Sequence, residues 1–158
     1  MLYILYGENT FELITQTIGR AGRASDKSDA IIQTFNSDNK IIEYAKNNDY
    51  ESLYNYEMNI RKKLNYPPYF YICSLMIISD KFESAAVVSN KVKKYLDNNL
   101  DQTYIILGPS VNSIVKLKNK YRFNILIKYK KDDKLKKVLN EINTMSFKNT
   151  TVDININI

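Results

Sequence analysis

The chain has 158 residues, of which 44% are apolar and 25% are charged, as in an ordinary globular protein. No apolar run approaches the roughly 20 residues needed to cross a bilayer, and the short apolar start lacks the flanks of a signal peptide, so we expect no membrane partner and a cytoplasmic location. One cysteine and no histidine exclude a disulfide, a Cys/His zinc site and a His-dependent nucleophile within the chain, and the net charge of +6 suits a polyanionic partner.

The first elements in the chain are predicted to be a helix, a loop and a strand. Asn9 or Thr10 can cap a helix that runs to about Ile18, with apolar residues at helical spacing. Two glycines within residues 19–23 favour a loop at that point. The β-rich run at residues 30–35 then predicts a strand.

Two further helices precede a proline pair that predicts a domain boundary. Apolar residues indicate one helix around residues 41–45 and another from Tyr50 to about Leu64. The second helix is expected to end before Pro67 and Pro68, because proline disfavours the α conformation in its predecessor. We therefore predict two domains, covering residues 1–65 and 66–158.

Beyond the prolines, the pattern changes to strands interleaved with helices. The expected order is strand, helix, two or three strands, helix and strand, where the last strand alternates apolar and polar residues. This order predicts an α/β (α+β) fold of ferredoxin-like type with two layers. The expected ranges are 69–79, 82–96, 104–107, 111–117, 123–129, a helix from about 132, and 151–158.

The segment most informative about chemistry is Gln16 to Arg23, which fits the helicase pattern Q-x-x-G-R-x-G-R. Five fixed positions would occur by chance in roughly one such chain in 20,000, so chance is a poor explanation. Hydrolysis of a nucleoside triphosphate needs positive charge beside the γ-phosphate, and a guanidinium supplies a permanent one. Arg20 and Arg23 are therefore the candidate catalytic residues, and Gly19 and Gly22 would let the backbone turn.

This segment and several later ones resemble the primosomal protein N-prime family of superfamily 2 DNA helicases. The later matches occur in the family's order and bring the coverage to about 150 residues, which is stronger evidence than any single motif. They are the run Ala30–Asn36, the set Glu57, Arg61 and Tyr66–Tyr69, the run Ile106–Pro109, the run Lys120–Asn124 and the run Val152–Asn155.

The resemblance implies a parent enzyme that hydrolyses ATP with Mg²⁺, unwinds DNA in the 3′ to 5′ direction and reloads the primosome in replication restart. Arg20 and Arg23 would reach ATP bound by another lobe, and Gln16, with Gly19 and Gly22, would couple that site to the motor. Residues 1–65 would be the end of a RecA-like helicase lobe with linker helices, and residues 66–158 a ribosomal-protein-like domain. Expected partners are forked or single-stranded DNA, single-strand DNA-binding protein and other primosome proteins.

The departures from the family pattern bear on activity. No phosphate-binding loop and no metal-binding D-E-x-H motif occurs, so we expect the chain to hold neither ATP nor Mg²⁺ by itself. The family's zinc insert is absent from the sequence too. Residues 1–7 do not resemble the family, which suggests a truncated, split or frame-shifted product. At the expected partner-binding segment, Lys120 replaces a frequent arginine and Asn124 a frequent glutamine.

Basic residues are concentrated in the second half, where residues 81–158 hold 15 Lys+Arg against 7 Asp+Glu. In a continuing strand, alternate positions from Lys116 to Arg122 would form one basic stripe suited to phosphates. A solvated polar face is the alternative interpretation. The candidate residues for DNA or partner binding are Lys116, Lys118, Lys120, Arg122 and Asn124.

Three functional hypotheses remain open from the sequence. The first is a C-terminal part of the helicase that binds DNA and partners. The second is a stand-alone nucleic-acid-binding module without motor function, and the third is a purely structural domain. Salt-sensitive DNA binding would separate the first two hypotheses from the third.

Overall fold

The computed structural model describes residues 2–21, 29–131 and 133–157. The chain forms two units, Met1–Leu64 and Asn65–Ile158, which we call the helical unit and the sheet unit. In the described part of the chain, no helix is both long and apolar enough to cross a membrane.

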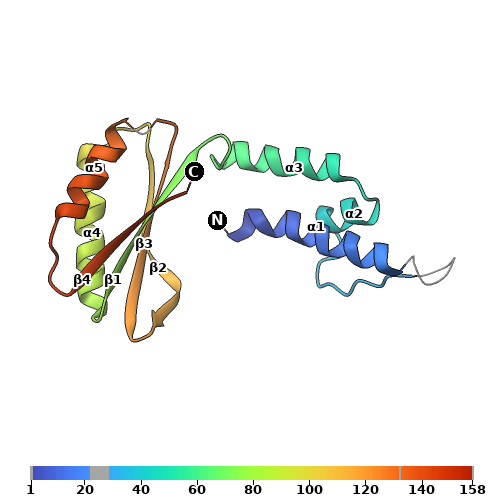
Figure 1. Ribbon diagram of the computed structural model, residues 1–158, viewed down its shortest axis with the longest axis horizontal. Coiled ribbons are helices and arrows are strands. Elements are labelled where there is room, and N and C mark those ends of the chain that lie inside the picture. Colours follow the sequence, from blue (N-terminus) through green and yellow to red (C-terminus); the bar gives the residue numbers. More distant parts are fainter. Residues whose placement is uncertain (1, 22–28, 132, 158) are drawn as a thin grey trace. The chain divides into compact units, whose positions relative to one another are not determined.

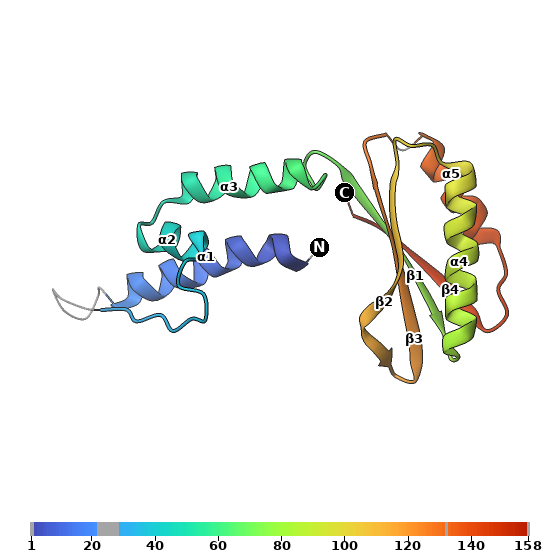
Figure 2. The same cartoon turned by 180° about the vertical axis from the view of Figure 1, so that it is seen from behind.

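Where the structure describes it, the sheet unit contains four strands and two helices in a ferredoxin-like order. The sheet has the strand order β2-β3-β1-β4, and all neighbouring strands are antiparallel. The two helices lie on the same side of the sheet (Figures 1 and 2), so the predicted two-layer α+β fold is confirmed. The elements are β1 (Tyr71–Ser79), α4 (Phe82–Asn99), β2 (Ile105–Leu117), β3 (Lys120–Tyr129), α5 (Asp133–Thr144) and β4 (Thr150–Asn157).

The core of the sheet unit lies between the sheet and its two helices. In β3, alternate residues from Phe123 to Tyr129 are buried in this core, as expected for a strand with one face on a hydrophobic layer. Leu75 and Ile77 contribute from β1 in the same way. The apolar stripes of α4 and α5 complete the core through Ala85, Val88, Val92, Leu96, Leu135, Val138, Leu139 and Ile142.

Strand β2 continues through a Gly-Pro pair where the sequence predicted a break between two strands. Gly108 has a φ of +98°, and a Cβ atom at this position would lie 2.6 Å from the backbone oxygen of Asn124. The pairing of β2 with β3 shifts register between Leu107 and Ser110, which is the signature of a bulge. Glycine therefore lets β2 bend and still pair with β3 on both sides of the irregularity.

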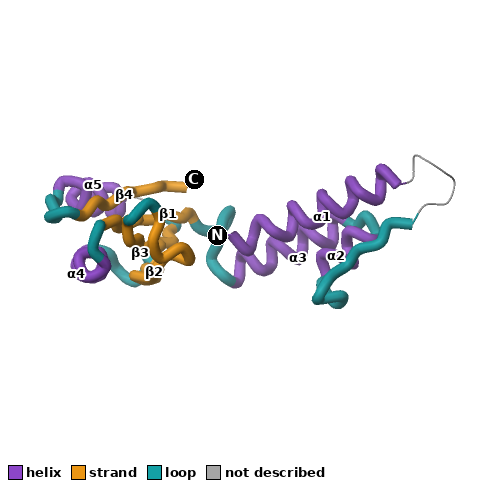
Figure 3. The backbone as a smooth tube through the Cα atoms, turned by 90° about the horizontal axis from the view of Figure 1, so that it is seen from below, coloured by secondary structure: helices purple, strands orange, loops and turns teal. Residues whose placement is uncertain are grey.

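The described residues of the helical unit form α1 (Leu2–Ala21), α2 (Lys40–Lys46) and α3 (Tyr50–Lys63). Asn39 caps α2 by accepting a hydrogen bond from the Ile41 amide, and Asp49 caps α3 in the same way through the Ser52 amide. The three helices pack around a small core of Phe11, Ala45 and Leu53. Figure 3 shows α1 and α3 running side by side.

Three predictions for the helical unit are wrong. The first helix was expected to be capped by Asn9 or Thr10, but α1 begins at Leu2 and both residues lie inside it. Residues 30–35 form no strand, and the side chains of Ile31 and Phe35 are almost fully exposed. A strand needs a hydrogen-bonding partner, and the described residues of this unit contain no other strand with which the run could pair. The loop predicted from Gly19 also begins later, because α1 continues through Gly19 to Ala21.

We predict that Gly108→Ala lowers the free energy of unfolding of the sheet unit by at least about 2 kcal/mol, because the new methyl group meets backbone and the left-handed φ disfavours alanine. Urea denaturation followed by circular dichroism measures this change. Gly19→Ala is the matched control. Gly19 lies in a helix with open space around its Cα, so alanine there should stabilise by up to about 1 kcal/mol. Equal effects at both positions would contradict the account.

Candidate functional sites

The last turns of α1 carry three of the five residues predicted to serve an ATP site. Gln16, Gly19 and Arg20 are exposed, and Gln16 and Arg20 share a helix face because they are four residues apart. Arg20 forms no ion pair with the residues that the structure describes. Gly22 and Arg23 lie outside the described residues.

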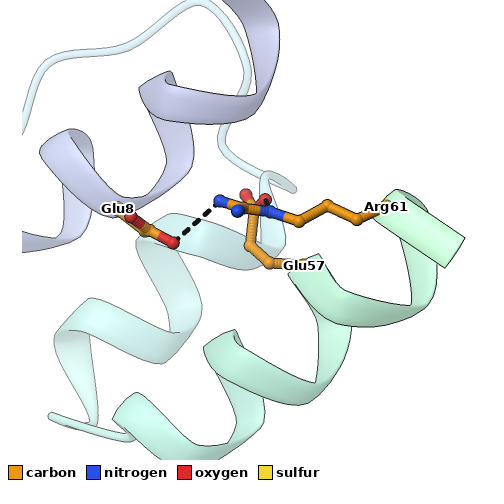
Figure 4. A network of polar contacts seen from close by, with 3 residues as sticks. All are labelled: Glu8, Glu57 and Arg61. Atoms are coloured by element: carbon orange, nitrogen blue, oxygen red, sulfur yellow. Dashed lines mark hydrogen bonds and ion pairs between the residues drawn. The ribbon is translucent and has the colours of Figure 1, made fainter. Parts of the chain in front are cut away.

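An ion network holds the first half of α1 to α3 (Figure 4). The Arg61 Nη2 atom donates a hydrogen bond to Glu8 Oε1 at 2.9 Å, and Arg61 Nε lies 3.8 Å from Glu57 Oε2. Glu57 is buried, and this burial raises the pKa of its carboxyl, while the nearby Arg61 charge acts in the opposite direction. The network thus fixes the helix that presents Gln16 and Arg20.

Close packing at Gly7 explains why α1 and α3 can approach at this network. A Cβ atom on Gly7 would overlap the buried carboxylate of Glu57 and would lie 3.3 Å from the Cδ1 atom of Ile41. The spacing of Glu57 and Arg61 was recognised in the sequence as part of a family pattern, but their partners Gly7 and Glu8 were missed. Nothing in the sequence indicated these pairs, whose members are 50 and 53 positions apart, so only the structure could supply them.

The basic residues predicted as a stripe lie around the hairpin between β2 and β3. Lys118 and Asn119 form its two-residue turn, with φ values of 51° and 61°, as in a type I′ turn. The turn interrupts the alternation, so Lys116 shares the face of Tyr121, with its Nζ atom 5.5 Å from the ring centroid. The single stripe expected for a continuing strand is therefore wrong.

Lys120, Arg122 and Asn124 lie on the face of β3 that points away from α4 and α5, because the residues between them alternate into the core. Lys120 is exposed and the other two are half-buried. The Nε atom of Arg122 is buried without a hydrogen-bond partner among the described residues. The backbone oxygen of Asn124 lies beside Gly108, so the β2 bulge positions this part of β3. Three of the five predicted binding residues thus share one face.

A family model described as "Primosomal protein N C-terminal domain" matches residues 62–157, which is more than half of the chain. The chain belongs to this family. The matched region contains the whole sheet unit up to Asn157, including Gly108 and the β2–β3 hairpin. The resemblance recognised in the sequence is thereby confirmed.

Several curated relatives carry the name Replication restart protein PriA. The Bacillus subtilis relative is 38% identical over 135 residues, covering 85% of this chain and 17% of its own length. The Borreliella burgdorferi relative is 36% identical over 154 residues, covering 95% and 23%. The Rickettsia typhi relative is 38% identical over 122 residues, covering 76% and 18%. The chain thus spans about a fifth of the length of these PriA proteins.

We predict that Arg61→Met destabilises the helical unit by about 2 kcal/mol at pH 7, because it leaves the Glu57 carboxylate buried beside Glu8 without a cation. The pKa of Glu57 is already raised and should rise further in this variant. Protonation then relieves the penalty, so the loss of stability should shrink as the pH falls through the raised pKa. Urea denaturation of both proteins at several pH values between pH 4 and pH 7 measures this loss of stability.

The double variant Glu57→Gln/Arg61→Met is the control for this titration. It has no ionisable group at position 57, so its stability relative to the parent chain should not improve at low pH through this mechanism. A loss for Arg61→Met that is the same at pH 4 and pH 7 would contradict the role assigned to Glu57.

Proposed function

We propose that this chain serves as the C-terminal part of an ATP-dependent 3′–5′ DNA helicase in replication restart, and that its own capacity is to bind DNA and partner proteins. The membership of its sheet unit in the primosomal protein N C-terminal family carries this proposal. The relatives' name, Replication restart protein PriA, supports the process. The motor activity and the partners are inferred from the family resemblance.

Charge supports DNA binding by the sheet unit. Residues 65–158 contain 15 Lys+Arg against 8 Asp+Glu, whereas residues 1–64 contain 8 against 9. Lys118 at the hairpin turn and Lys120 at the start of β3 are exposed on the basic unit, and Arg122 follows on the same face as Lys120. Lysine and arginine that neutralise phosphates release counterions, which is the main source of affinity for nucleic acid.

The end of α1 suits the second proposed role, which is to supply arginine to an ATP site. Arg20 is exposed on the same helix face as Gln16, and we propose that Arg20 and Arg23 stabilise charge on the γ-phosphate. ATP and Mg²⁺ would be held by a phosphate loop and acidic motif that this sequence lacks.

Partner binding is proposed for the exposed face of β3. Lys120 and Asn124 lie on one face and are four residues apart, with Arg122 between them on that face, so an acidic peptide tail along the strand can meet both a cation and an amide. We propose the tail of single-strand DNA-binding protein as this partner, together with other primosome proteins. A stand-alone nucleic-acid-binding module is the second candidate function, favoured by the separate hydrophobic core of the sheet unit.

We predict that Lys118→Glu/Lys120→Glu weakens binding to single-stranded and forked DNA about tenfold or more at about 0.1 M salt, since two phosphate contacts become repulsive. The slope of log affinity against log salt should fall by about 2. Fluorescence anisotropy at several salt concentrations measures both quantities.

The control for this experiment is Lys91→Glu/Lys94→Glu on α4, where two exposed lysines change charge by the same amount away from the hairpin. It should weaken binding much less. Equal losses in the two variants would show that only net charge matters, and unaltered binding in the hairpin variant would contradict the assigned surface.

We predict that the isolated chain hydrolyses ATP no faster than its Arg20→Ala variant, with or without DNA, because arginines alone cannot hold nucleotide and Mg²⁺. A phosphate-release assay compares the two proteins. Hydrolysis by the parent chain that Arg20→Ala abolishes would mean that this chain contains a complete ATP site, contrary to the proposal.

A further inference from the structure

Two cavities in the sheet unit share Lys130 and Lys131, which directly follow β3. One cavity of about 600 Å³ lies beside Tyr71, Tyr129 and Ile156. The other, of about 480 Å³, lies beside Phe70 and the segment from Gln102 to Ile105. The two lysines therefore stand between two hollows that both have aromatic and apolar walls.

Tyr71 is the more accessible of the two aromatic residues that line the larger cavity. Its ring centroid lies 5.6 Å from that of Tyr129, with an interplanar angle of 36°. Tyr129 is buried in the core, whereas Tyr71 is 47% exposed. Tyr129 thus fixes Tyr71 from one side, and the exposed part of the Tyr71 ring can accept another flat ring. In the smaller cavity, Lys130 Nζ lies 4.8 Å from the centroid of Phe70.

The charges around these cavities favour an anionic ligand. Among the described residues, Lys130, Lys131 and Lys136 line the larger cavity together with one carboxylate, that of Asp133. Lys130 and Lys131 form no ion pair with a described residue. A ligand that presents both flat apolar rings and regularly spaced negative charges would match the combination of aromatic walls and lysines.

We propose that this end of the sheet unit binds single-stranded nucleic acid, with a base stacked on Tyr71 and the adjoining phosphates on Lys130 and Lys131. This site rests on the proposed DNA-binding function and adds a second contact region to it. The hairpin lies at the start of β3, with Lys120 and Arg122 on the face without helices, whereas Tyr71 lies beside the core residue Tyr129 at the other end of β3, on the side of the sheet that carries α5. The two contact regions are therefore separate. Duplex DNA cannot present an unstacked base, so the site selects single strands.

The test compares two oligomers of about 15 nucleotides, one of deoxythymidine and one that is abasic with the same phosphates. The full chain should bind the deoxythymidine oligomer about tenfold more tightly, because stacking needs a base whereas phosphate contacts do not. Anisotropy competition at constant salt measures the ratio of the two affinities. A ratio close to one would overturn the proposal without any substitution.

Four variants, one of them a control, test whether the affinity ratio of the two oligomers arises at this site. Tyr71→Ala should remove most of the preference for bases, and Tyr71→Phe should retain it because the ring remains. Tyr54→Ala on α3, where the tyrosine is 51% exposed, is the matched control and should leave the ratio unchanged. Lys130→Gln/Lys131→Gln should weaken the binding of both oligomers and lower the slope of log affinity against log salt by about 2.

The results separate this inference from the proposed function. If the parent chain binds no DNA, both fail. If Lys118→Glu/Lys120→Glu weakens binding while Tyr71→Ala leaves the ratio intact, the proposed function stands and the stacking site is overturned. A competition experiment with a fluorescent probe whose binding requires Tyr71 gives a further outcome. If a short acidic peptide displaces this probe and the deoxythymidine oligomer does not, the proposal is overturned in favour of peptide binding.

Discussion

The pairing of β3 with β1 and β2 is the constraint on which the sheet unit depends. It directs alternate residues from Phe123 to Tyr129 into the core, so the polar residues between them must occupy the opposite face. Lys128 follows this alternation even though its side chain becomes buried. It is only 6% exposed, its Nζ atom lies 3.7 Å from the ring centroid of Tyr66, and burial lowers the pKa of its ammonium group. The same strand thereby presents Lys120 and Arg122 on the face without helices, and its end leads into Lys130.

Much of this fold could be predicted from local pattern. The period-two alternation of the closing strand and the apolar stripes of the helices are properties of consecutive residues, and they specified the order of elements in the sheet unit. The prediction of a single basic stripe was wrong because Lys118 and Asn119 adopt positive φ values and form a turn. The alternation of charges in the sequence does not indicate this turn. The sequence predicted a break between strands at Gly108. The close approach of Gly108 to Asn124 involves a residue 16 positions away, which local pattern does not reveal.

The helical unit was harder to predict because its structure depends on partners distant in sequence. The run 30–35 has the composition of a strand, yet strand formation depends on a neighbouring backbone that the described part of this unit does not provide. Gly19 is tolerated within α1, because one glycine costs a helix only about 1 kcal/mol. The family resemblance supplied the candidate roles of Gln16 and Arg20, whereas the structure supplied their exposure and the Glu8–Arg61–Glu57 network that holds their helix.

The central claim is that nucleic acid binds at two separate regions of the sheet unit, the β2–β3 hairpin and the end of β3 beyond Tyr129. The most direct measurement is a nuclear magnetic resonance titration of the full chain with single-stranded DNA, following backbone amides residue by residue. The account predicts shifts at Lys118–Arg122 and at Tyr71, Lys130 and Lys131, with little change along the exposed face of α4. Shifts confined to α4 or to the helical unit would contradict it.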